Sequence, residues 1–163
     1  MRLELMSDED VELRVRMETD PGLMSELGGP RPKVDIERAH AKSLLLAAEG
    51  ECWPMKIIPD GSEVPAGNVD IFRSSHDGED IYEIGWMILP EFQGRGLASR
   101  AVHEMLERAR NERKFGRLHA FPGVTNGASN RICEKNGFTK VGELNVEFAG
   151  RPLRCNHWWI DLF

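Results

Sequence analysis

The sequence predicts one domain of the α/β class, or α+β under some schemes, in which helices cover a sheet. Its 163 residues suit one hydrophobic core and leave little room for a second domain, so residues 1–163 are expected to form one unit. Two helical patterns come first in the chain. Strand patterns interleaved with two more helices follow, and this order of elements indicates the class.

The first half of the chain carries two helical patterns and three strand patterns. Residues 2–7 alternate apolar and polar side chains, as a half-buried strand does. Ser7 or Asp8 is suited to cap the next helix, which should end near Asp20 and Pro21. The elements expected here are strand 2–7, helix 8–19, loop 26–32, helix 35–49, strand 52–59, turn 60–67 and strand 68–75.

The second half alternates strands with helices. Residues 81–89 are rich in β-branched and aromatic side chains, which favours a strand. One apolar stripe then recurs at helical spacing through Ala98, Ala101, Val102, Met105, Leu106 and Ala109. The other elements expected are a strand within 117–122, helix 126–137, strand 139–148, turn 149–152 and strand 153–162.

Composition narrows the classes of function. The net charge of -6 argues against a nucleic-acid partner, which normally meets a basic face. Cys52, Cys133 and Cys155 form no CxxC pair, so neither a disulfide framework nor a metal site is expected, and a reduced, cytoplasmic setting fits. The N-terminus is charged throughout, unlike a signal peptide, and no apolar run approaches the ~20 residues that span a bilayer.

A glycine loop, residues 93–98 (QGRGLA), joins strand 81–89 to the apolar helix. A P-loop is excluded because no lysine follows these glycines. A dinucleotide fingerprint needs GxGxxG/A, but Ser99 stands in its last position and no βαβ unit follows. A tight strand-to-helix turn without a ligand is the remaining plain interpretation.

The same loop matches the [RQ]-x-x-G-x-[GA] element of the GNAT N-acetyltransferases at every specified position. A second segment, NGASNRICEKNGF, resembles that family's N-x-x-[SA]…EK-x-GF element at Asn126, Ser129, Glu134, Lys135, Gly137 and Phe138. The chain therefore resembles the GNAT superfamily, and within it the subgroup that acetylates ribosomal-protein N-termini. The resemblance implies a mixed, mostly antiparallel sheet of about six to seven strands with helices on both faces, splayed between strands 81–89 and 117–122.

In that family the loop binds acetyl-CoA, so the resemblance implies acetyl-CoA as a co-substrate. Backbone N–H groups of residues 94–98 and the positive end of the helix that begins near Leu97 would hold its pyrophosphate. Gln93 would close the loop by a side-chain hydrogen bond, while Arg95 either adds charge or is a solvated loop cation. The expected cofactor contacts are Met87, Ile88, Leu89, Gln93, Gly94, Arg95, Gly96, Leu97, Ala98, Ser99, Asn126, Ser129 and Asn130.

The resemblance also implies the reaction: a neutral primary amine attacks the thioester directly in a ternary complex. Free backbone N–H groups near Met87 to Leu89 would bond the thioester carbonyl in the splayed gap. Glu83, on the strand before the loop, is the first candidate for the base that takes the amine proton. His119 on the following strand is the second, although a lone strand histidine is more often structural.

The acid that assists the departing thiolate is harder to assign. Many relatives carry a tyrosine where this chain has Cys133, and its only tyrosine, Tyr82, lies far from that slot. The Cys133 thiol could serve, but a small core residue is its stronger interpretation. Ser129 followed by Asn130 matches the ribosomal subgroup, so Ser129 is the preferred candidate. Asn126 and Asn130 either hold the cofactor or cap the helix.

The acceptor is expected to be a small amine or a peptide N-terminus. Family acceptor sites use the N-terminal helices and the last strand pair, and neither carries a signature here. Acidic residues 8–12 and the tryptophans could attract or line an acceptor, but a helix start and core packing explain them equally. The alternative function is an acyl-CoA-binding sensor without efficient transfer. Edge strands and Trp158-Trp159 make a homodimer a further prediction.

Overall fold

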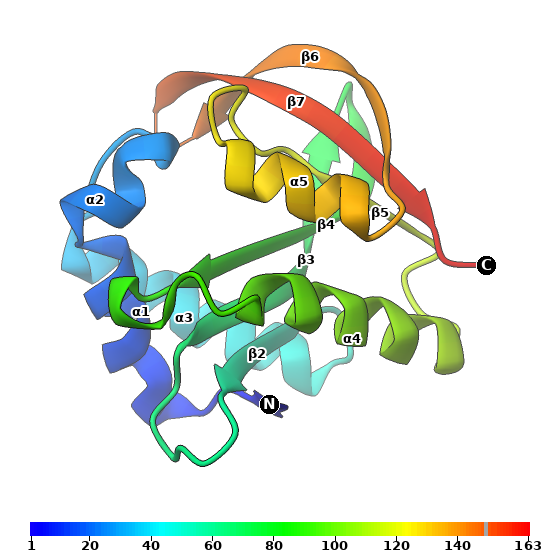
Figure 1. Cartoon of the computed structure of the whole chain (residues 1–163). Coiled ribbons are helices and arrows are strands. Elements are labelled where there is room, and N and C mark those ends of the chain that lie inside the picture. Colours follow the sequence, from blue (N-terminus) through cyan, green and yellow to red (C-terminus); the bar gives the residue numbers. More distant parts are fainter. Residues whose placement is uncertain (149) are drawn as a thin grey trace.

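The computed structural model describes residues 1–148 and 150–163, which form a strongly curved sheet with helices on its faces (Figure 1). The sheet has 7 strands in the order β1-β2-β3-β4-β5-β7-β6. All neighbouring strands are antiparallel except β4 and β5, which run parallel. The predicted class, a mixed and mostly antiparallel sheet covered by helices, is therefore confirmed.

The strands are β1 (Arg2–Leu5), β2 (Trp53–Ile58), β3 (Gly67–His76), β4 (Glu79–Ile88), β5 (Arg117–Ala120), β6 (Thr139–Phe148) and β7 (Arg151–Asp161). The α-helices are α1 (Val11–Glu18), α2 (Pro21–Met24), α3 (Lys33–Ala48), α4 (Leu97–Asn111) and α5 (Gly127–Lys135). Short 3-10 turns are η1 (Asp8–Asp10), η2 (Ser25–Leu27) and η3 (Pro90–Phe92).

The parallel pair β4 and β5 is the feature that positions the site. The two strands are in register only at Tyr82 with Leu118 and at Glu83 with His119. Beyond Glu83 the strands separate, while β4 stays paired with β3 along its whole length. The predicted splay is therefore confirmed, and it leaves one edge of β4 without a partner strand among the described residues.

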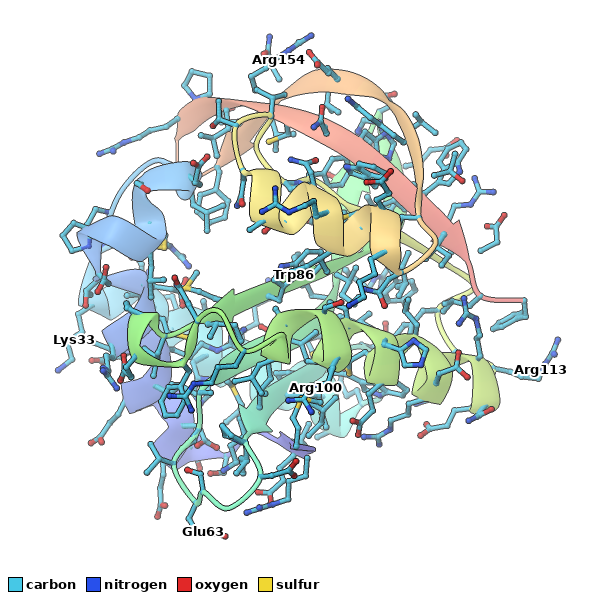
Figure 2. All side chains as sticks on the ribbon, in the orientation of Figure 1. Lys33, Glu63, Trp86, Arg100, Arg113 and Arg154 are labelled. Atoms are coloured by element: carbon cyan, nitrogen blue, oxygen red, sulfur yellow. The ribbon has the colours of Figure 1, made fainter. Side chains whose placement is uncertain are left out.

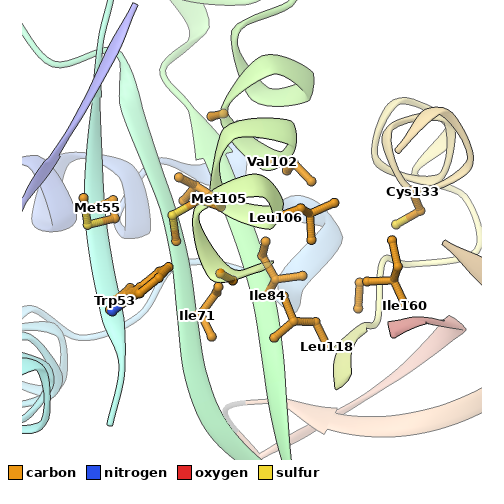
Figure 3. Packing of buried hydrophobic residues seen from close by; sticks show 14 of the residues in the cluster. Trp53, Met55, Ile71, Ile84, Val102, Met105, Leu106, Leu118, Cys133 and Ile160 are labelled. Carbon is orange, nitrogen blue, oxygen red and sulfur yellow. The ribbon is translucent and has the colours of Figure 1, made fainter. Parts of the chain in front are cut away.

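The core explains which helices lie on which face. In Figure 3 the α4 residues Met105 and Leu106 lie over Ile71 of β3 and Ile84 of β4, and all four are buried. The predicted stripe is buried at Ala101, Val102, Met105, Leu106 and Ala109, as a helix that covers a sheet requires. The N-terminal helices α1, α2 and α3 cover the opposite face (Figure 1).

The largest difference from the sequence prediction lies between α1 and α3. No element was predicted for residues 21–25, yet α2 begins at Pro21, with Asp20 as N-cap accepting from the Leu23 N–H at 2.9 Å. Proline at the first helical position fits because its missing N–H needs no partner there. The signal was present in the sequence, but α2 has 4 residues and falls below the length at which periodicity is informative.

Two smaller expectations concern the C-terminal hairpin. The predicted turn 149–152 is shorter than expected, because Arg151 and Pro152 already belong to β7; Ala149 lies outside the described residues. The homodimer stays a prediction, and the structure places Trp158 and Trp159 within the sheet. Both residues lie on β7, which has β5 on one side and β6 on the other, so neither sits on an edge strand.

Candidate active site

A cleft of about 840 Å³ passes through the gap between β4 and β5. One half of its lining comes from the glycine loop, the start of α4 and α5, and the other half from α1, α2, β3 and the ends of β5 and β6. Trp86 of β4 lines it as well, and Figure 2 shows this side chain between α4 and α5. The cleft therefore joins the two faces of the sheet at the splay.

The glycine loop presents backbone N–H groups to the first half of the cleft. Gly94 and Gly96 have φ values of 76° and 72°, in the left-handed region that favours glycine. The Arg100 N–H donates to the Gly96 carbonyl at 3.2 Å, which is the first bond of α4. The N–H groups of Leu97, Ala98 and Ser99 therefore have no carbonyl partner within the helix, and a helix start of this kind binds anions.

Two side chains of this loop behave differently. Gln93 Nε2 donates to the Ile88 carbonyl at 3.0 Å, so this side chain closes the loop onto the end of β4. Arg95 turns away: its guanidinium donates to the Glu91 carbonyl at 3.1 Å and lies 5.2 Å from the Phe92 ring centre. Arg95 is not among the residues that line the cleft, so its side chain is not placed for a cofactor contact.

The N–H groups of β4 that face the gap differ by one residue from those predicted. The Leu89 N–H donates to the Ala66 carbonyl at 2.8 Å and Leu89 is 1 % exposed, so the expectation that this N–H is free was wrong. Hydrogen-bonded pairs alternate along an antiparallel ladder, so the Met87 N–H also faces β3. The N–H groups of Trp86 and Ile88 instead face the gap, where β5 no longer pairs with β4.

The start of α5 places Ser129 on the cleft and fixes it there. Asn126 is the N-cap of this helix, and its Oδ1 accepts from the Ser129 N–H at 3.1 Å. Ser129 is in the first turn and half-buried in the cleft lining. Asn126 lines the cleft too, so capping and cleft contact are compatible for this residue.

Asn130 has a structural role, contrary to the expectation that it contacts the cofactor. Its Nδ2 donates to the carbonyls of Gly123 and Asn126 at 3.0 and 2.8 Å. Its Oδ1 accepts from Asn156 Nδ2 at 2.8 Å and Trp158 Nε1 at 2.9 Å. All four hydrogen-bonding positions of the amide are used, so Asn130 ties α5 to β7 and has none left for a ligand.

Glu83 is the titratable residue on β4 that faces the cleft. It lies directly across from Phe72 on β3, where the splay begins, and lines the same cleft as the glycine loop. Burial raises the pKa of the Glu83 carboxyl to about 7, and a side-chain hydrogen bond with Ser74 opposes part of that shift. A carboxylate with this pKa is half-ionised near neutral pH and can accept a proton from an amine.

His119, the second candidate base, is engaged elsewhere. Its Nδ1 is 2.8 Å from His157 Nε2, the side chain is 7 % exposed, and it is absent from the cleft lining. The His119 and His157 rings stack at 5.1 Å, and Phe121 stacks on His157 at 4.7 Å. Burial lowers the pKa of both imidazoles, that of His157 to about 4, with neighbouring charges of the cluster adding to the effect.

Cys133 occupies the slot where many relatives carry a tyrosine, and it is core. Its side chain is 0 % exposed and points toward Ile160 (Figure 3). Burial raises the pKa of the Cys133 thiol to about 12, and the residue does not line the cleft. Tyr82 packs its ring edge against Phe115 at 4.8 Å, outside this cleft. Neither residue is placed to donate a proton in it.

The second half of the cleft holds the residues that the sequence did not reveal. An apolar wall is formed by side chains from four separate segments: Met17, Leu23, Leu27, Phe72, Phe121 and Phe148. One signal was available: in strand 68–75, Val69 and Ile71 occupy the core face, which leaves Phe72 as an aromatic residue on the other face. The remaining members could not be found from spacing because tertiary contact alone brings them together.

The residues suggested earlier for acceptor attraction lie elsewhere. Asp8, Glu9, Asp10 and Glu12 do not line the cleft. Asp10 instead accepts from the Ser7 N–H at 2.8 Å and pairs with Lys56 at 3.1 Å, so its role is the helix start. Of the four tryptophans Trp86 lines this cleft, Trp53 and Trp158 belong to the core, and Trp159 packs against His119 and His157.

Comparison with known proteins identifies the class. The family model described as "Acetyltransferase (GNAT) domain" matches residues 1–139. The chain therefore belongs to the GNAT acetyltransferases, a family of acyltransferases, and the recognition made from the two sequence segments is confirmed.

Named relatives agree with this assignment. The chain is 33 % identical over 86 residues to "Uncharacterized N-acetyltransferase YnaD" of Bacillus subtilis (strain 168), a match that covers 53 % of this chain and 48 % of the relative. The matched part thus spans about half the length of that relative. Separately, the helices within residues 1–148 and 150–163 are too short or too polar to span a bilayer.

Solved structures share the fold at low identity. The ribosomal-protein-S5-alanine acetyltransferase from Vibrio fischeri superposes with a TM-score of 0.80 at 14 % identity, over 98 % of this chain and 91 % of that one. The spermidine N-acetyltransferase from Vibrio cholerae, solved with CoA and spermine, gives 0.79 at 18 % identity over 99 % and 95 %. At these identities the likeness defines the fold and leaves the acceptor open.

Proposed function

We propose that this chain is an acetyl-CoA-dependent N-acetyltransferase in which a primary amine attacks the thioester directly within a ternary complex. The observation that carries the proposal is one continuous cleft that contains both the free N–H groups at the start of α4 and the Glu83 carboxyl. An anion-binding helix start and a proton acceptor of raised pKa are the two parts this reaction needs.

The roles divide along the cleft. The backbone of Gly94 to Ser99 would hold the pyrophosphate, closed by Gln93, and the N–H groups of Trp86 and Ile88 would bond the thioester carbonyl in the splay. Glu83 would take a proton from the amine, directly or through water, as the C–N bond forms. The C–S bond then breaks, and the Ser129 hydroxyl would donate a hydrogen bond to the departing thiolate.

A second candidate function is an acyl-CoA-binding sensor that transfers little. The observation that favours it is Cys133, whose buried thiol cannot replace the tyrosine that many relatives carry in this slot. Under this alternative the first half of the cleft binds acetyl-CoA and the second half binds no reactive amine.

The test is release of CoA from acetyl-CoA over a panel of amines, followed by initial rates with both substrates varied. Transfer in a ternary complex predicts intersecting double-reciprocal lines, whereas a covalent acetyl-enzyme gives parallel ones. Tight binding of acetyl-CoA without turnover on any amine supports the sensor. A chain that shows neither turnover nor a thermal shift with acetyl-CoA contradicts both functions.

A further inference from the structure

The second half of the cleft has a composition that defines which amines fit. We infer that the acceptor is a primary monoamine carried on an apolar group such as an aromatic ring. This inference rests on the proposed function, because it names the substrate of the same cleft.

The apolar wall is placed directly beside the proposed base. Phe72 is across the β3–β4 ladder from Glu83, on the same face, and remains 36 % exposed. Its Cε1 lies 3.7 Å from the position of a Cβ on Gly85, so the ring extends over Gly85 toward the splay. Phe121, Phe148, Leu23 and Leu27 line the same half of the cleft. An amine nitrogen at Glu83 would therefore have its carbon substituent against this wall.

The charged residues of the cleft favour an acceptor with few cationic groups. Three carboxylates line the cleft, and two of them are Glu18 and Glu26. Glu18 is paired with Arg31 at 2.7 Å, and Glu26 accepts from Thr125 Oγ1 at 3.0 Å. Besides Glu83, Glu26 is thus the one lining carboxylate without a salt bridge in the part of the chain that the structure describes. A multiply charged amine would place its other ammonium groups against phenylalanine and leucine side chains, which do not replace lost water.

Among residues 1–148 and 150–163, Arg14 is the one cation on the wall of this half, and it is neutralised within the protein. Arg14 lines the cleft, but its Nη1 is 2.6 Å from Asp70 Oδ2, and the two side chains are only 12 % and 15 % exposed. Arg14 is therefore unavailable to bind an acidic acceptor group such as a free amino-acid carboxylate. An uncharged apolar substituent meets none of these restrictions.

The experiment compares kcat/KM for 2-phenylethylamine, phenylalanine amide, free phenylalanine and spermidine with the full chain and acetyl-CoA. We expect 2-phenylethylamine and phenylalanine amide to exceed spermidine and free phenylalanine by about 10-fold or more. The ratio of kcat/KM for 2-phenylethylamine to that for phenylalanine amide distinguishes a free arylalkylamine from an aromatic peptide N-terminus as the acceptor. A preference for spermidine or for free phenylalanine overturns the inference while leaving the transferase proposal intact.

Variants localise the preference. Phe72→Ala should lower kcat/KM for 2-phenylethylamine about 10-fold, mainly through KM, and leave ethylamine nearly unchanged. Phe163→Ala is the matched control, since Phe163 is 57 % exposed and outside the cleft lining. Equal losses for both amines, or no loss for either, contradict the inferred contact. If no amine releases CoA, the proposed function itself fails and this inference fails with it.

Discussion

The two halves of the cleft are built by different means. The half formed by the glycine loop, α4 and α5 uses backbone N–H groups and two short sequence segments. The half formed by α1, α2, β3 and the ends of β5 and β6 uses side chains from segments far apart in the chain. Backbone recognition needs glycine at fixed positions and is visible in a sequence, whereas a wall assembled by tertiary contact is not.

The largest effect is expected at the glycine loop. Gly96→Glu would place a negative charge at the helix start and a side chain on a residue whose φ is 72°. We expect acetyl-CoA to bind at least ~100-fold more weakly, because charge repulsion adds to backbone strain. Isothermal titration with acetyl-CoA measures the change.

A matched control separates strain from charge at the site. Gly78 in the β3–β4 turn has φ 77°, and a Cβ there would meet no atom within 4 Å, as at Gly96. Gly78→Glu should therefore carry a similar strain and leave acetyl-CoA affinity unchanged. Equal weakening by the two variants would show that the loop is not the anion site.

The second-largest effect is expected from Glu83, the proposed proton acceptor, which lies where the two halves of the cleft meet. Glu83→Gln should lower kcat about 100-fold or more without changing acetyl-CoA affinity. In the wild type kcat/KM should rise with pH through about 7, since Glu83 must lose its proton to act as a base. In Glu83→Gln the inflection near pH 7 should vanish, leaving the rise caused by deprotonation of the amine; an unchanged inflection would assign it to another group.

The same variant tests the cause of the pKa shift. The folded pKa of Glu83 is about 7, above the usual 4.5, so its ionisation lowers the free energy of unfolding as pH rises between those values. Glu83→Gln cannot ionise and should be relatively more stable at pH 8 than at pH 5, compared with the wild type. Thermal melts at the two pH values measure this, and a constant difference would contradict burial as the cause.

A smaller effect is expected from Ser129, which lies in the first half of the cleft. Ser129→Ala should reduce turnover about 10-fold with little change in acetyl-CoA affinity, because only the departing thiolate loses a hydrogen bond. Cys133→Ala serves as the control, since the buried Cys133 thiol lies outside the cleft lining. The turnover of this variant per folded molecule should match that of the wild type. Full activity in Ser129→Ala would remove this residue from the chemistry.

The smallest effect concerns His157, which stacks on Phe121 of the second half of the cleft. Because the folded pKa of His157 is about 4, the unfolded chain binds its proton more readily, and stability falls as pH drops from 6.5 toward 4. His157→Gln should reduce that loss by about 3 °C in Tm or more. His103→Gln on the exposed face of α4 is the control. Identical Tm profiles in wild type and His157→Gln would contradict the lowered pKa.

Particular residues show why one part of this molecule could be predicted and another could not. The α4 stripe follows from periodicity, whereas the splay between β4 and β5 and the role of Gly96 came from the resemblance to the GNAT family. Leu89 was misassigned because sequence order does not say which N–H groups of β4 face β3. Asn130 matched a family motif, but its bonds to Asn156 and Trp158 depend on where β7 returns.

In the proposed reaction the two halves of the cleft act together in acetyl transfer. The most direct measurement is the yield of N-acetylated product from acetyl-CoA and 2-phenylethylamine, by mass spectrometry, with wild type and Glu83→Gln at equal acetyl-CoA saturation. We expect product with the wild type and at least ~100-fold less with the variant. Equal yields from the two proteins, or binding of acetyl-CoA with no product from either, would contradict it.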